Sequence, residues 1–77
     1  MTDLERHVDE QMEFFTSKHK LSKRESEVLK LVVLGKNNQE IAEELFLALG
    51  TVKTHVHNIM VKTGCADRAS LTKAFWN

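Results

Sequence analysis

The sequence contains few of the residues that interrupt helices or crosslink chains: no proline, three glycines and one cysteine among its 77 residues. The lack of proline and the small number of glycines favour long helices over a turn-rich sheet. The only cysteine, Cys65, cannot form an internal disulfide and has no partner at metal-ligand spacing. No apolar run approaches the ~20 residues that a membrane helix needs, and the charged N-terminus lacks the apolar region of a signal peptide. We therefore expect one all-α protein in the cytoplasm, with no membrane anchor, metal or other cofactor.

Charge is balanced overall but distributed unevenly, with 11 basic and 11 acidic residues. Residues 1–17 contain five acids and one base, so the remaining chain has ten bases and six acids. No acid lies between Glu44 and Asp67. An acid-free helix is a candidate surface for binding phosphate groups.

Residues 1–20 form a segment of their own in the sequence pattern. Leu4, Val8, Met12 and Phe15 recur at steps of four, four and three, which predicts an acidic amphipathic helix. The polar run from Ser17 to Lys20 is interpreted as a short linker. A second unit, residues 21–77, would then form the main domain.

Two capping boxes mark the first helices of this domain. Ser22 with Glu25 predicts a helix start, and Gly35 follows at about the position of a C-terminal cap, which gives a helix of about 22–34. Asn37 with Glu40 predicts the start of a short second helix.

A third helix of about 49–63 follows a turn at Leu47–Gly50. Its apolar side is formed by Val52, Val56 and Ile59, with Thr63. Asp67 is placed to cap a fourth and last helix. A short helix, a turn and an acid-free helix form the arrangement of a helix-turn-helix unit.

The polar face of the third helix is the candidate binding surface. On a helical wheel of about 100° per residue, short or hydrogen-bonding side chains and cations lie on the side opposite the apolar stripe and on the two flanks. These are the residue types that reach base edges and phosphates from the major groove. The candidates are Thr51, Lys53, Thr54, His55, His57, Asn58 and Lys62. Spacing alone leaves open an ordinary solvated face, because any amphipathic surface helix has a polar side.

Four motifs at fixed intervals run through residues 21–68. They are Leu21-Ser-Lys-Arg-Glu25, Gly35-x-x-Asn38-x-Glu40-Ile41-Ala42-x-x-Leu45, Thr51-Val52-Lys53-Thr54-His55-Val56, and Ile59-x-x-Lys62-x-Gly64 followed by Arg68. In these residues and intervals the chain resembles the LuxR/GerE family of regulators. The resemblance implies a tetrahelical helix-turn-helix fold that regulates transcription by binding double-stranded DNA through the third helix. It also implies a homodimer, formed through the fourth helix, on a pseudo-palindromic site.

Roles carried over by position agree with the helical wheel. The resemblance places Lys53, Thr54 and His57 near base edges, and Thr51, Asn58 and Lys62 at the DNA backbone. It places Glu25 and Arg68 as a structural pair. In the last helix, the candidates for a dimer interface are Leu71, Phe75 and Trp76.

The chain departs from the family at several positions, Ala48, Leu49, Gly50 and Thr63, and an alternative function stays open. The family usually has Ser or Thr where this chain has Ala48, so the third helix lacks a capping hydroxyl. A protein-interaction module of the same fold, which pairs with another regulator and has lost DNA binding, is the alternative. The N-terminal helix is a candidate surface for such a partner regulator. No nucleophile, base and orienting group can be assembled from the sequence, so we do not expect an enzyme.

Overall fold

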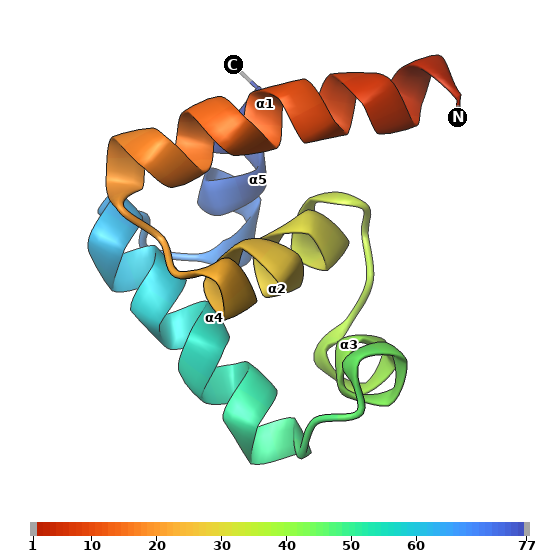
Figure 1. The fold of residues 1–77 in the computed structure, drawn as a ribbon. Coiled ribbons are helices and arrows are strands. Elements are labelled where there is room, and N and C mark those ends of the chain that lie inside the picture. Colours follow the sequence, from red (N-terminus) through yellow and green to blue (C-terminus); the bar gives the residue numbers. More distant parts are fainter. Residues whose placement is uncertain (1, 77) are drawn as a thin grey trace.

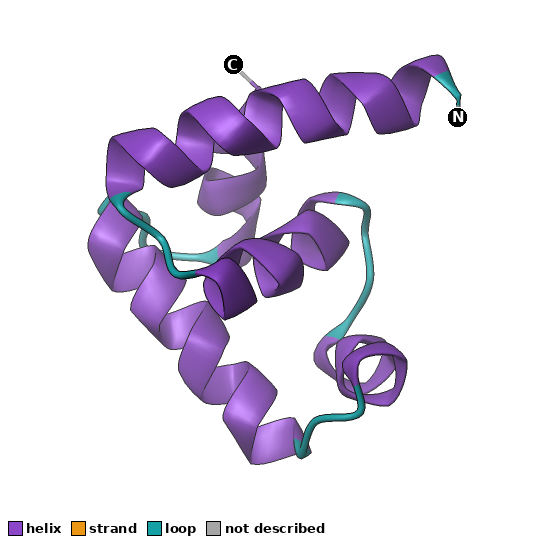
Figure 2. Ribbon diagram, viewed as in Figure 1, coloured by secondary structure: helices purple, strands orange, loops and turns teal. Residues whose placement is uncertain are grey.

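The computed structural model describes residues 2–76, which form five α-helices and no strand (Figure 1, Figure 2). The prediction of an all-α fold with an additional N-terminal helix is confirmed. None of the helices in this part of the chain is long and apolar enough to cross a membrane. In chain order the helices are α1 (Asp3–His19), α2 (Lys23–Val33), α3 (Asn38–Leu45), α4 (Leu49–Thr63) and α5 (Arg68–Trp76).

Local capping explains where α2, α3 and α5 begin. Ser22 and Glu25 form the predicted capping box of α2: the Ser22 Oγ accepts from the Glu25 N–H, and the Glu25 carboxylate accepts from the Ser22 N–H at 2.8 Å. Asn37 and Glu40 do the same for α3, with both distances 2.9 Å. The Asp67 carboxylate accepts from the Ser70 N–H at 2.7 Å at the start of α5. These side chains satisfy N–H groups that a helix leaves without internal partners.

The core is centred on α2, which lies between the other helices in Figure 1. Val28 and Leu29 of α2 are fully buried, as are Ile41 of α3 and Val52 and Ile59 of α4. The C-terminal end of α4 lies near α1, and α3 lies beside the N-terminal end of α4 (Figure 1). Packing of α4 on both α2 and α3 fixes its orientation and leaves one of its faces outward.

Helix α1 is longer than predicted. The run from Ser17 to His19, interpreted as a linker, belongs to the helix, which ends at Lys20 in the left-handed conformation (φ 56°). None of these polar residues breaks a helix, and the Thr16 hydroxyl lies 2.8 Å from that of Ser26 in α2, which holds the last turn against the domain.

Helix α1 also contributes to the same core as the other helices. Val8 is fully buried and Phe15 is 3% exposed. The Phe15 ring packs edge-on against Phe75 of α5, with ring centroids 5.5 Å apart, and the Gln11 side-chain amide donates to the Phe75 carbonyl at 3.0 Å. The N-terminal helix therefore covers α5 as well as α2.

Candidate nucleic-acid interface

Helix α4 has one buried and one exposed side. Val52, Val56 and Ile59 are buried against α2 and α3. The opposite side is exposed at the predicted positions Lys53, Thr54, His57 and Asn58. On the flanks, Thr51 and Lys62 are exposed and His55 is half-buried. The structure thus brings the seven predicted side chains onto one helix with the exposure that the wheel predicts.

A tight turn of three residues joins α3 to α4. Phe46 ends α3 in the left-handed conformation (φ 56°), and the Leu47 N–H donates to the Ala42 carbonyl at 2.9 Å. Phe46 is 95% exposed. The sequence gives no signal for this conformation, because Gly or Asn is the usual residue at such a position. The turn places α3 and α4 as the two helices of a helix-turn-helix unit, and the loop is visible in Figure 2.

The first turn of α4 has no side-chain cap. Ala48 occupies the N-cap position without a side-chain hydrogen bond, and no acidic residue is present in the first turn. The Thr54 hydroxyl donates to the Gly50 carbonyl at 3.0 Å, so it is not available as a donor to another molecule. The first turn of α4 therefore offers neither a capping side chain nor an acidic residue to the positive end of its helix dipole.

Glu25 holds the C-terminal part of α4 against the start of α2. Its carboxylate, 6% exposed, lies 2.7 Å from the Lys62 Nζ, and the Lys62 side chain is 41% exposed. Burial alone would raise the pKa of Glu25, but the hydrogen bond and charge of Lys62, together with the hydrogen bonds from Ser22, outweigh burial and lower the pKa. The same carboxylate thus closes the capping box of α2 and anchors α4.

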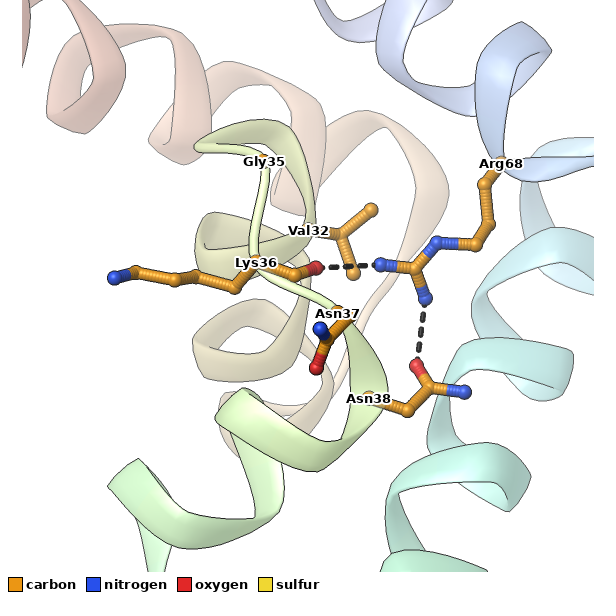
Figure 3. A pocket seen from close by; sticks show the side chains of 6 residues that line it. All are labelled: Val32, Gly35, Lys36, Asn37, Asn38 and Arg68. Atoms are coloured by element: carbon orange, nitrogen blue, oxygen red, sulfur yellow. Dashed lines mark hydrogen bonds between the residues drawn. The ribbon is translucent and has the colours of Figure 1, made fainter.

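The predicted pair of Glu25 with Arg68 is wrong. Arg68 extends instead into the loop between α2 and α3, where its guanidinium donates to the Asn38 Oδ1 and to the Lys36 carbonyl, each at 2.7 Å (Figure 3). Glu25 lies in the first turn of α2 and this loop follows the last turn, roughly 15 Å away at 1.5 Å per residue. Arg68 therefore fixes α5 to the entrance of α3, and Asn38 is a structural partner that the sequence reasoning missed.

Two of the three residues predicted for a dimer interface are not at the surface. Leu71 and Phe75 are fully buried within the single chain, Phe75 beneath α1. They are unavailable to a second copy in this arrangement. The prediction did not take into account that α1 packs on the last helix. Trp76 is 36% exposed, and its ring lies parallel to that of His7, with centroids 6.2 Å apart.

Comparison with known protein families matches residues 19–75 to the bacterial regulatory proteins of the luxR family. This match covers most of the chain and all of α2, α3 and α4. The chain belongs to the LuxR family. The match begins at the end of α1, so nearly all of that helix lies outside the family domain.

Curated relatives from the LuxR family share about half of the aligned residues. The transcriptional regulatory protein LiaR of Bacillus subtilis is 54% identical over 48 residues, which are 62% of this chain and 23% of LiaR. The oxygen regulatory protein NreC of Staphylococcus aureus is 45% identical over 53 residues, 69% of this chain and 24% of NreC. The spore germination protein GerE of B. subtilis is 47% identical over 55 residues, 71% of this chain and 74% of GerE. The chain thus spans about a quarter of the length of LiaR and NreC but most of GerE. No solved structure matches the chain.

Membership of the LuxR family makes this a domain of a DNA-binding regulator family and not of an enzyme family. Within that domain, α3 and α4 occupy the helix-turn-helix unit, and the seven candidate residues all lie on α4.

Proposed function

We propose that the chain is a transcriptional regulator that binds double-stranded DNA by inserting α4 into the major groove. The observation that carries the proposal is the outward face of α4. It is exposed and free of acids, and it lies on a helix whose other side is fixed in the core by Val52, Val56 and Ile59. A helix with this composition can approach phosphates and base edges without repulsion between carboxylates and the negatively charged DNA backbone.

Three residues on this face are proposed to read bases. The Lys53 ammonium can donate to guanine N7 or O6, and His57 can hydrogen-bond to a base edge. Thr54 uses its hydroxyl hydrogen on the Gly50 carbonyl, so we propose that it meets a thymine methyl through its own methyl group.

The remaining residues are proposed to bind the DNA backbone. Thr51 lies in the uncapped first turn of α4, where backbone N–H groups and a hydroxyl can share one phosphate. Asn58 and the half-buried His55 lie further along the helix. Lys62 has N–H donors left besides the one directed at Glu25, and the ion pair holds its ammonium on the flank of α4, where we propose a phosphate contact.

We further propose that two copies bind a pseudo-palindromic site, with the two recognition helices about one helical turn apart. Trp76 is the remaining aromatic side chain of α5 that a second copy can reach. Such a contact is small, so the dimer is expected to form mainly when two half-sites hold the copies together. As a bacterial regulator it would act in the cytoplasm, at the nucleoid when bound to DNA.

The second candidate function is a protein-interaction module of the same fold that no longer binds DNA. The missing cap at Ala48 favours it, because the entrance of the recognition helix is less well fixed than a capping hydroxyl would make it. The acid-free face of α4 opposes it, since a surface that does not meet phosphate has no electrostatic reason to exclude carboxylates.

Selection from a pool of random duplexes tests the proposal directly. The purified chain is expected to enrich related sequences, and binding is then measured for the enriched duplex and for an unrelated one. Lys53→Ala is expected to lower affinity for the enriched duplex by roughly tenfold and to relax its sequence preference. Lys62→Ala is expected to weaken binding to both duplexes alike. Lys73→Ala removes the same charge from an exposed position of α5 and serves as the control.

Two outcomes would contradict the proposal. Failure of the folded chain to enrich any sequence at low salt would favour the interaction module. Equal losses for the variants at positions 53 and 73, on both duplexes, would mean that the charge of the whole chain and not the face of α4 attracts DNA. Sedimentation with duplexes carrying one and two half-sites tests the dimer, and one chain per duplex in both cases at saturation would exclude it.

A further inference from the structure

A groove of about 410 Å³ lies between α1, α2 and α3. Its apolar lining consists of Leu31 of α2, Leu34 directly after the end of α2, and Leu45 of α3. Three carboxylates from three different helices, Glu5, Glu27 and Glu44, line it as well. None of the lining residues belongs to α4, so the groove is separate from the proposed DNA interface.

The leucines of the groove are only partly covered by the chain itself. Leu34 is 39% exposed and Leu45 is half-buried, whereas Leu31 is 9% exposed at the edge of the core. These leucines form a small apolar surface bordered by polar residues, which is the composition of a recognition groove.

The charge around these leucines is negative. The groove contains one cation, Lys30, but its Nζ lies 3.0 Å from Asp9 and is already paired. Glu27 is paired with Arg24 at 2.8 Å. Neither Glu5 nor Glu44 makes an ion pair within residues 2–76. Two carboxylates therefore remain without a compensating charge beside an apolar surface.

We propose that this groove binds a basic amphipathic helix of a partner protein, with apolar side chains placed on the leucines and Lys or Arg side chains near Glu5 and Glu44. An amphipathic helix in an apolar groove is a recurrent mode of recognition, and complementary charge around the groove selects and orients the partner. Nucleic acid and anionic lipid are excluded as occupants, because their phosphates would be repelled by the same carboxylates.

A second copy of the chain is a poorer occupant. Two helices have no acidic residue, α4 and α5. Placing the α4 cations Lys53 and Lys62 in the groove of another copy would remove them from DNA, and α5 offers one exposed cation, Lys73, because its Arg68 is bound to Asn38 and the Lys36 carbonyl. A separate basic partner can bind while α4 remains in the major groove. The groove thus supplies a contact between a DNA-bound regulator and another protein.

Binding of designed peptides to the isotope-labelled full chain tests the groove. The probe is a synthetic helix of leucine and lysine with leucines at i, i+3, i+4 and i+7. One control peptide has the same composition in scrambled order, and another has glutamate in place of lysine. Affinity is measured by fluorescence anisotropy, and the site is located from amide chemical-shift changes. No DNA is present, so the result does not depend on whether α4 binds DNA.

Matched variants distinguish the groove from a general attraction of charge. Glu44→Lys is expected to lower the affinity for the basic peptide by about tenfold. Glu43→Lys makes the same change at the exposed neighbour, which does not line the groove, and is expected to have a much smaller effect. Leu34→Ser is expected to weaken binding, whereas Val61→Ser, at an apolar residue of α4 that is 66% exposed, is not.

The expected result is binding of the basic amphipathic peptide alone, with shifts centred on Leu31, Leu34 and Leu45. Equal binding of the scrambled peptide, equal losses at positions 43 and 44, or shifts confined to α4 would each overturn the proposal. Shifts at the groove that grow with protein concentration in the absence of peptide would assign it to a second copy instead. If Leu34→Ser fails to fold by circular dichroism, the pair of α3 variants and the shift map still decide the question.

Discussion

Replacing Phe15 by alanine tests whether α1 is part of the folded domain. Phe15 is 3% exposed and packs edge-on against Phe75 of α5. Removing a buried phenylalanine costs about 3–5 kcal/mol, because the transfer energy of the ring is lost and a cavity remains. A chain of this length has about 4–12 kcal/mol of total stability at 0.05–0.15 kcal/mol per residue. Phe15→Ala should therefore remove roughly a quarter or more of the free energy of unfolding.

The neighbouring residue provides a matched control. Phe14 is 62% exposed, and its ring has the Lys18 Nζ 6.0 Å from its centroid. Phe14→Ala loses this exposed cation–π contact, worth at most about 1 kcal/mol, and gains about 0.5 kcal/mol because alanine is the better helix former. The same substitution at two adjacent positions of α1 should thus differ by about 2.5 kcal/mol or more in its effect on the free energy of unfolding.

Urea unfolding of the three proteins measures these differences. The loss of helix signal in circular dichroism as urea is added gives the free energy of unfolding. Trp76 fluorescence reports on the position of α1, because the Trp76 ring lies parallel to that of His7 in α1. Phe15→Ala should also change the native fluorescence, since loosening α1 withdraws His7 from Trp76. A difference below about 1 kcal/mol between the two variants, or unchanged Trp76 emission in Phe15→Ala, would show that α1 is not docked on α5 in solution.

Three further predictions concern the two ends of α4. Glu25→Ala should destabilise the protein by about 2 kcal/mol, because both the Ser22 N–H and the Lys62 ammonium lose their acceptor; an unchanged melting temperature would contradict the observed pairing. Since the pKa of Glu25 is lowered on folding, ionised Glu25 stabilises the fold above about pH 4.3, and this contribution is lost as the pH falls through the lower, folded pKa. Glu25→Gln should therefore show a flatter decline of unfolding free energy below pH 4.3, and identical slopes would refute the linkage. Ala48→Ser should raise the free energy of unfolding by about 0.5–2 kcal/mol by capping α4, and no gain in a urea titration would mean that the first turn is already satisfied.

Features with a short-range origin could be predicted from the order of residues. The capping boxes at Ser22 and Asn37 and the cap at Asp67 form as expected, because each joins a side chain to a backbone N–H three residues further along the chain. The buried and exposed sides of α4 follow in the same way from the spacing of Val52, Val56 and Ile59, since a helix of 3.6 residues per turn places them on one side.

Features that depend on which helices meet could not be predicted in this way. Glu25 pairs with Lys62, 37 residues away, and Arg68 pairs with Asn38, 30 residues away, although the resemblance placed Glu25 and Arg68 together. Both cations are charged donors of similar reach, so composition does not distinguish between them as partners of Glu25. Glu25–Lys62 lies at the first turn of α2, and Arg68–Asn38 lies at the loop after its last turn, so the length of α2 separates the two pairs.

The burial of α5 has the same kind of cause. The pattern of Leu71, Phe75 and Trp76 indicates more apolar surface than one side of a helix can hide, and a second copy is one way to cover it. In the folded chain α1 covers Phe75, and only Trp76 remains partly exposed. Periodicity identifies a face that must be covered, because it follows from the geometry of one helix, but the covering element is selected by packing among helices distant in the chain, where any apolar face of suitable shape competes for the same position.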